Sequence, residues 1–280
     1  MTSQILYSNI LTKTIAIVAF HQLHSCLFHV HACDTQESPY PYPIPPKSDR
    51  PWNPNWDEKH CSFSASSKVL GASGDAASGG ECNQQSATKP KAKRNIFLIR
   101  HGQYHHKTGR LTKTGKEQAT ITGERLQAMG YPFRKKLISS TMIRALETAS
   151  FIRRSNYQFE IKPIDSICEG APFSTEPKFD HSPTDEQVEH DTERIEKSFC
   201  SLFYRASVEQ MKDSYELVVC HSNVIRYFVC RALQFPPDAW MRFVLNNCSI
   251  TWLVIHPDGH VELKAMGDAE HLPAPLVTNC

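Results

Sequence analysis

The sequence predicts an α/β fold with a mainly parallel sheet over residues 95–280. The first reason is a continuous apolar run, Ile96–Ile99, which is typical of a strand buried on both faces. The second is that apolar strands alternate with amphipathic helices from Asn95 onward. The third is that arginine or histidine lies at or within four residues of the ends of three expected strands, at the sheet edge where α/β proteins place their chemistry.

The expected elements follow from local patterns. Short apolar runs predict strands at 96–99, 137–140, 161–164, 216–220, 249–256 and 261–265. Apolar residues at helical spacing predict helices at 114–129, 141–153, 185–205, 224–233 and 236–245. Thr114 with Glu117 fits a capping box at the start of the first helix, and Gly130 with Pro132 ends it.

Composition limits the classes of protein and of site. A length of 280 residues is enough for one large domain plus extra segments. A net charge of +2 gives no reason to expect a nucleic-acid partner. Ten cysteines lie scattered without Cys-x-x-Cys spacing, several of them in apolar runs. This pattern favours reduced thiols in an intracellular protein over a disulfide framework, and argues against a structural zinc site.

Residues 1–33 form an uncertain apolar segment. A run at 15–20 is apolar, but Lys13 and four histidines interrupt the stretch around it. A spanning helix needs roughly 20 mostly apolar residues, so these histidines make it a poor one. A membrane anchor, a cleaved signal and a start that is not the native one remain alternatives.

Residues 34–94 are expected to be a flexible linker, because they are rich in proline, serine and glycine and carry few large apolar residues. One island at 51–57 departs from this composition, since it holds Trp52 and Trp56. Tryptophan commonly anchors interfaces, so the island either binds another chain or packs against this chain's own domain.

Titratable groups gather where three strands end. Arg100 and His101 follow the first strand, Arg144 follows the second by four residues, and His221 ends the strand at 216–220. Parallel strands joined by helices place such ends side by side. Two arginines are suited to grip a phosphate by paired hydrogen bonds, and a histidine can act as a nucleophile. The pattern therefore predicts phosphoryl transfer through a phosphohistidine.

An acid must also protonate the leaving oxygen. Glu169 is the one acid in the Gly/Pro-containing loop at 168–172, and burial would raise its pKa toward the range in which it can donate. The chain contains no P-loop, no Gly-rich nucleotide fingerprint and no metal-ligand spacing. We therefore expect neither a nucleotide nor a metal cofactor.

These motifs resemble those of the histidine phosphatase superfamily. The matching segments are Arg-His-Gly at 100–102, Leu-Thr-x-x-Gly at 111–115, Ser-x-x-x-Arg-Ala-x-Glu-Thr at 140–148, and the second histidine, His221. The resemblance implies a three-layer αβα sandwich of the phosphoglycerate mutase type. It also implies that His101 accepts the phosphoryl group, that Arg100, Arg144 and His221 bind it, and that Glu169 is the proton donor and then the base for water.

Four segments are similar to those of the mitochondrial serine/threonine protein phosphatases within this superfamily: 169–172, 221–227, 231–237 and 52–57. This similarity implies a metal-independent enzyme that acts on phosphoproteins at the mitochondrial outer membrane, anchored by its N-terminus. It also implies a homo-oligomer that is more active than its subunits. The multimerisation motif would be Trp52, Asn53, Pro54, Asn55, Trp56 and Asp57. The histidines in 11–32 depart from the membrane helix of those proteins.

Two other functions stay open. A phosphoglycerate mutase or small-molecule phosphatase would need cations to clasp a carboxylate or second phosphate, and the segment 170–183 offers only Lys178. We therefore favour hydrolysis. The other alternative is an oligomeric scaffold or adaptor that works through the tryptophan island, which a His101→Ala variant would distinguish from an enzyme.

Overall fold

The computed structural model describes residues 51–57, 89–155, 159–178 and 180–279. The expectations for residues 1–33, and for most of the linker at 34–94, fall outside these ranges. Among the helices that are described, none has the length and apolar character that crossing a bilayer requires.

The described part is built on one six-stranded mixed sheet in the order β3-β2-β4-β1-β5-β6. β1 pairs in parallel with β4, and β2 pairs in parallel with both β3 and β4. β5 runs antiparallel to β1 and to β6. The strands are β1 (Arg94–Arg100), β2 (Phe133–Ser140), β3 (Glu160–Ile164), β4 (Ser214–Cys220), β5 (Ile250–Ile255) and β6 (Val261–Asp268).

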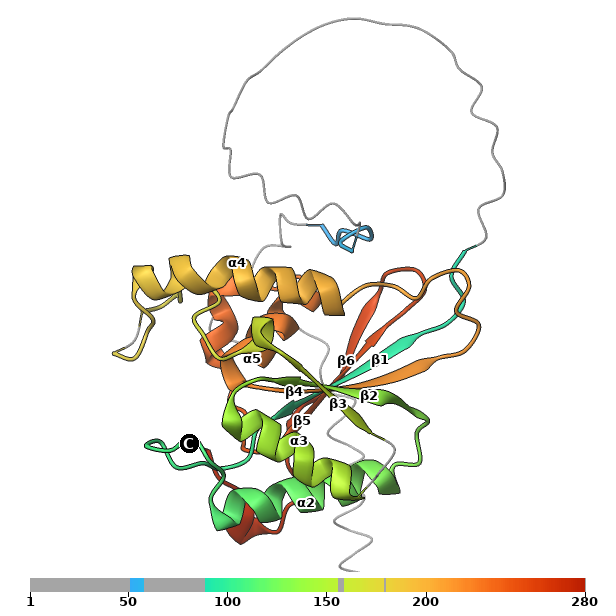
Figure 1. Ribbon diagram of the computed structural model, residues 1–280. Helices are drawn as coiled ribbons and strands as arrows, with labels where there is room; N and C mark the ends of the chain where they lie inside the picture. The colour runs from blue at the N-terminus through green and yellow to red at the C-terminus, as the bar shows by residue number, and fades with distance from the viewer. Residues whose placement is uncertain (1–50, 58–88, 156–158, 179, 280) are drawn as a thin grey trace, which may run out of the picture. The chain divides into compact units, whose positions relative to one another are not determined.

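Helices cover both faces of this sheet (Figure 1). α2 (Lys113–Ala128) and α3 (Ile143–Ser155) lie on one face, and α4 (Asp185–Leu202) and α5 (Ser222–Ala232) lie on the other. Short 3-10 helices occur at η1 (Asp165–Ile167), η2 (Pro237–Arg242) and η3 (Ala274–Leu276). The arrangement is the three-layer αβα sandwich that the sequence analysis predicts.

The central strand β1 explains why the core has two halves. All seven of its residues are buried. Ile96 and Leu98 face the α4–α5 side, while Phe97 and Ile99 face the α2–α3 side. Alternate residues of a strand point to opposite faces, so an unbroken apolar run is what a strand between two helical layers requires.

The structure corrects some element boundaries. The cap of α2 is Thr112, whose side chain accepts from the Gly115 amide, so the predicted Thr114–Glu117 capping box is wrong. The capping box occurs instead at α4, between Thr184 and Gln187. The helix expected at 236–245 is a 3-10 helix of six residues, Pro237–Arg242.

The tryptophan island packs against this chain's own domain. Trp56 lies against Phe199 of α4, and its indole nitrogen donates to the carbonyl of Gly259 at 2.7 Å. Asp57 pairs with Arg205 just beyond α4. Trp52 lies near His260, with 6.1 Å between ring centroids. The tryptophan island therefore packs against its own chain, which is one of the two alternatives that the sequence left open.

Candidate active site

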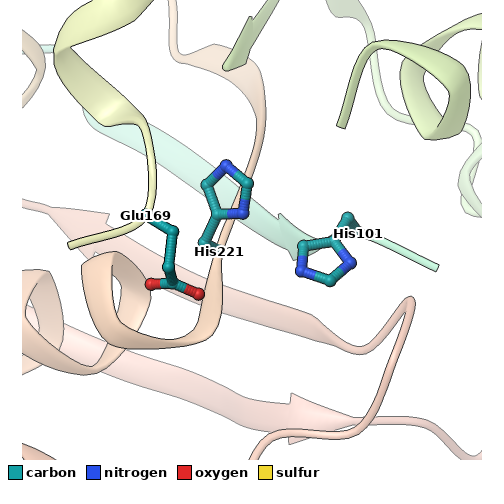
Figure 2. Close-up of side chains that lie close together, drawn as sticks. All are labelled: His101, Glu169 and His221. Atoms are coloured by element: carbon teal, nitrogen blue, oxygen red, sulfur yellow. The ribbon is translucent and has the colours of Figure 1, made fainter. Parts of the chain in front are cut away.

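Two histidines meet at the carboxyl ends of the central strands. Arg100 at the end of β1 pairs with Cys220 at the end of β4, and the next residue on each strand is a histidine. The His101 amide donates to the Cys220 carbonyl at 3.0 Å, which fixes the two chains at this point. The ring centroids of His101 and His221 are 5.1 Å apart. Figure 2 shows the two rings beside the Glu169 carboxyl group.

The contacts of His101 assign its tautomer. Nδ1 lies 2.9 Å from the Gly102 carbonyl, which can only accept, so Nδ1 carries the proton. Arg144 Nε donates to Nε2 of His101 at 3.1 Å. The lone pair on Nε2 therefore points toward Arg144 and accepts from its guanidinium.

Arg144 is oriented by its surroundings at the start of α3. Its guanidinium carbon lies 4.6 Å from the centroid of the Tyr104 ring, in cation–π contact. One turn later, the Thr148 hydroxyl donates to the Arg144 carbonyl and accepts from the Gly102 amide at 3.0 Å. Thr148 thereby ties α3 to the loop that carries His101.

Residues of other parts of the chain hold His221 and Arg100 in place. Nε2 of His221 lies 2.8 Å from the hydroxyl of Ser140, the last residue of β2. Among the described residues, its Nδ1 has no hydrogen-bond partner. Arg100 donates to the Leu245 carbonyl and to the Asn279 side chain, and it is 6% exposed.

Glu169 is held in the loop between η1 and α4. Its Oε1 accepts from the Asn223 amide at 3.1 Å, in the first turn of α5. Its carboxylate, His101 and His221 each offer a ligand atom within 4.8 Å of the others. Burial raises the pKa of Glu169, although the charges of Arg144 and Arg100 oppose this shift. The protonated acid is thus favoured relative to a carboxyl group in water.

Both imidazoles are neutral in this environment. Burial, followed by the charges of Arg144 and Arg100, lowers the pKa of His101 to about 3. Burial also lowers the pKa of His221 well below its usual value, with His101 and both guanidiniums adding to the shift. A neutral imidazole keeps the lone pair that a nucleophile needs.

By their geometry alone, His101, Glu169 and His221 could hold a metal ion. Two imidazoles and a carboxylate are a ligand set that transition metals accept. Here, however, the guanidiniums of Arg100 and Arg144 act on all three groups, and their positive charge opposes a cation and favours an anion. The charge at the site therefore fits a phosphoryl group better than a metal.

The structure brings together every site residue predicted for the chemistry, namely Arg100, His101, Arg144, Glu169 and His221. Trp52–Asp57 belongs to a separate surface, where it contacts the chain beyond α4 and the β5–β6 turn. Two other groups do not join the site. Glu147 binds the Leu111 amide and Arg110, and Cys220 is a buried thiol whose pKa burial raises.

Sequence reasoning missed the residues that hold the site in place. Ser140 and Thr148 lie within the motif at 140–148, but only the fold reveals their contacts with His221 and Gly102. Asn223 follows His221 by two residues, and its helical amide at the start of α5 was the available signal.

The chain matches known proteins over most of its length. The model of the histidine phosphatase superfamily (branch 1) matches residues 96–269. A Xenopus laevis protein named serine/threonine-protein phosphatase PGAM5, mitochondrial, is 42% identical over 241 residues, or 84% of this chain and 86% of that protein. The Homo sapiens protein of that name is 43% identical over 235 residues, or 81% and 80%.

A solved structure shares the fold. An Escherichia coli protein described as an alpha-ribazole-5'-P phosphatase has a TM-score of 0.50 and 22% sequence identity to this chain. The match covers 62% of this chain and 96% of that one. At this identity, the likeness concerns the fold alone.

Proposed function

Because the chain belongs to the histidine phosphatase superfamily, we propose that it hydrolyses phosphoserine and phosphothreonine in proteins through a phosphohistidine on His101. The observation that carries the proposal is the cluster of His101, His221 and Glu169, whose ligand atoms lie within 4.8 Å of one another beside two guanidiniums. The names of the relatives support serine and threonine as the dephosphorylated residues.

In the first step, Nε2 of His101 attacks phosphorus and the bond to the serine or threonine oxygen breaks. Glu169 gives its proton to that oxygen, which leaves as the hydroxyl. Arg100, Arg144 and His221 bind the phosphoryl oxygens and offset their charge. The Gly102 carbonyl accepts from Nδ1–H of His101, so it stabilises the positive charge that develops on the imidazole.

In the second step, the Glu169 carboxylate takes a proton from water as the water oxygen attacks phosphorus. The phosphorus–nitrogen bond breaks, inorganic phosphate leaves, and both His101 and Glu169 return to their starting states. A raised pKa suits Glu169 to both roles, because a general acid works best when its pKa is near the pH at which the enzyme acts.

The cavity next to Glu169 supports hydrolysis over phosphoglycerate mutation. It has a volume of about 500 Å³ and opens between the loop at 169–171, the segment 181–183, α4, α5 and η2. Its described lining includes the carboxyl groups of Glu169 and Asp191 but neither lysine nor arginine. Such a wall offers the carboxylate of a mutase substrate no cationic partner, whereas a peptide substrate without that carboxylate does not need one.

We also propose the domain organisation 1–33, 34–94 and 95–280, with homo-oligomers formed through residues 52–57. The surface that receives Trp56 and Asp57 is made by Phe199, Arg205 and Gly259. Another subunit's motif could occupy that surface equally well, because the contacts depend on the motif and not on the linker that follows it. An oligomeric scaffold remains the second candidate, and assembly is compatible with catalysis.

The relatives are named mitochondrial, which supports a mitochondrial location for this chain. We propose that residues 1–33 attach it to the outer membrane. Fractionation of cells that express the full chain, with protease added to intact mitochondria, tests this placement. Recovery of the chain in a fraction other than the mitochondrial outer membrane would contradict this placement.

Activity of residues 51–280 on a phosphothreonine peptide tests the enzyme directly, with 3-phosphoglycerate as the comparison substrate. We expect release of phosphate from the peptide, unchanged by a metal chelator and absent in His101→Ala. Protein quenched in an alkaline denaturant, in which phosphohistidine is stable, should carry phosphate on His101. Interconversion of phosphoglycerates would instead identify a mutase, and a folded, assembled protein that turns over neither substrate would favour the scaffold.

A further inference from the structure

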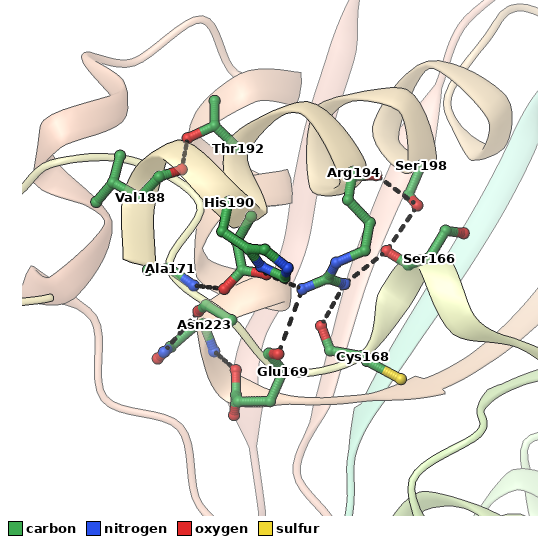
Figure 3. A network of polar contacts seen from close by, with 12 residues as sticks. Ser166, Cys168, Glu169, Ala171, Val188, His190, Thr192, Arg194, Ser198 and Asn223 are labelled. Carbon is green, nitrogen blue, oxygen red and sulfur yellow. Dashed lines mark hydrogen bonds and ion pairs between the residues drawn. The ribbon is translucent and has the colours of Figure 1, made fainter. Parts of the chain in front are cut away.

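The loop that carries Glu169 lies outside the strands and helices, yet it is tied down along its length (Figure 3). It runs from Cys168 to Ala171, directly after η1, and side chains of α4 and α5 bind its backbone and the Ser166 carbonyl of η1. A proton donor on a loop must be held as firmly as one on a helix, because catalysis depends on its position.

Arg194, in the middle of α4, makes more of these contacts than any other side chain. Its Nη1 donates to the carbonyls of Ser166 at 3.1 Å and Cys168 at 2.9 Å. Its Nη2 points at the Glu169 carbonyl at 3.4 Å. The flat guanidinium thus reaches three backbone carbonyls from two of its nitrogens, an arrangement that the single nitrogen of a lysine does not reproduce.

Asp191 completes the arrangement from the preceding turn of α4. Its Oδ1 accepts from Arg194 Nη2 at 2.7 Å, and its Oδ2 accepts from the Ala171 amide at 3.0 Å. Hydrogen bonds to Arg194 and to that amide hold the pKa of Asp191 below its usual value, so the aspartate is ionised. Arg194 and Asp191 therefore bind the loop on both sides of Glu169.

The packing at Gly170 shows how closely the two side chains approach. A methyl group on its α-carbon would lie 2.5 Å from Asp191 Oδ2 and 2.6 Å from Arg194 Nη2. From the other side, the Asn223 side chain donates to the Gly170 carbonyl at 3.0 Å. A larger residue at position 170 would therefore push the Asp191–Arg194 ion pair away from the loop backbone.

We propose that Arg194, held by Asp191, is a positioning residue that fixes the Glu169 proton donor for attack at phosphorus. The inference rests on the proposed function of Glu169. The hydrogen bonds of Arg194 go to the backbone of residues 166–169 and to Asp191, so it acts on Glu169 through the loop backbone.

The substrate's leaving group gives a specific test of this role. A serine or threonine oxygen needs a proton to leave, whereas nitrophenolate leaves without one. A misplaced Glu169 should therefore slow phosphorylation of His101 by a phosphopeptide and spare p-nitrophenyl phosphate. We compare kcat/KM, since it reports the steps through phosphoenzyme formation and is unaffected by the later use of Glu169 as a base.

The variants are Arg194→Met and Arg194→Lys, with Gly170→Ala as a second way to displace the loop. Arg231→Met is the matched control, because Arg231 also makes a paired ion contact to α4, through Glu196, but does not touch the loop. In Arg194→Met, we expect kcat/KM for the phosphopeptide to fall about 100-fold, the loss that a shift of about 1 Å can cause. For p-nitrophenyl phosphate, the loss should be about threefold or less, as for a surface change.

In Arg194→Lys, kcat/KM for the phosphopeptide should lie between the values for Arg194→Met and wild type. In Arg231→Met, kcat/KM should stay near the wild-type value for both substrates. Equal losses for both substrates in Arg194→Met, or no loss for either, would overturn the positioning role. Urea unfolding of each variant identifies a change that only lowers stability. Failure of the proposed function is distinguishable, because then His101→Ala would keep the wild-type activity on both substrates.

Discussion

The neutral state of His101 should lower the stability of this protein in acid. In the unfolded chain, an imidazole takes up a proton below its ordinary pKa of 6.5, whereas in the native site this happens only below about 3. Between these values, the unfolded state binds more protons, so the free energy of unfolding falls as the pH is lowered. The effect is absent above 6.5, where His101 is neutral in both states.

The size of the effect follows from the two pKa values. At about pH 5, the difference between 6.5 and about 3 corresponds to a loss of about 2 kcal/mol relative to about pH 8. This contribution arises because burial and the charges of Arg144 and Arg100 disfavour the imidazolium ion. His221 is buried beside it and adds a loss of the same sign.

Urea unfolding at both pH values, for wild type and His101→Asn, measures this contribution. On acidification, the free energy of unfolding of the variant should fall by up to about 2 kcal/mol less than that of wild type, since the variant has no imidazole to protonate at that position. His105→Asn is the control, because His105 lies exposed in the loop after β1 and should leave the acid loss unchanged. An equal loss in wild type and His101→Asn would refute the argument that this site holds a neutral histidine.

Three further predictions test other parts of the site. Glu169→Gln should lower kcat/KM for a phosphopeptide by about 100-fold. In a pH–rate profile, kcat/KM of the wild type should decline as pH rises through the raised pKa of Glu169, and the variant should not show this decline. Thr148→Val should lower the free energy of unfolding by about 1–3 kcal/mol in urea, because the buried Gly102 amide loses its acceptor; an unchanged value would mean that another group replaces it. Trp56→Ala should weaken self-association by about 30-fold in analytical ultracentrifugation, as expected for an anchor worth about 2 kcal/mol, and unchanged assembly would exclude the motif.

The sequence could place Arg100, His101 and His221 because each follows directly from a strand whose burial is visible in its apolar residues. Arg100 pairs with Cys220, and the two histidines become neighbours through parallel pairing alone. The prediction of Glu169 depended on composition, since it is the one acid in a short Gly/Pro loop. In each case, a local pattern was enough to indicate the place of the side chain.

Other features depend on contacts that no local pattern reveals. Arg194 lies in an amphipathic helix rich in charge, and its partners Ser166 and Cys168 are 28 and 26 residues away. The capping box at 114–117 was wrong because Thr112 also bonds to Gln103, so the contact with the preceding loop decides where α2 begins. Tertiary contacts can override a local signal in this way.

The arrangement around His101 links substrate binding to the exposure of the nucleophile. The Nε–H of Arg144 donates to Nε2 of His101, so the lone pair that would attack phosphorus is engaged by this guanidinium. A bound phosphoryl group is a much stronger acceptor for a guanidinium than a neutral imidazole is. In the proposed mechanism, its oxygens would therefore draw the Arg144 guanidinium away from Nε2. The same arginine would then bind the substrate and free the nucleophile, while burial and the charge of this arginine together favour the neutral form of His101.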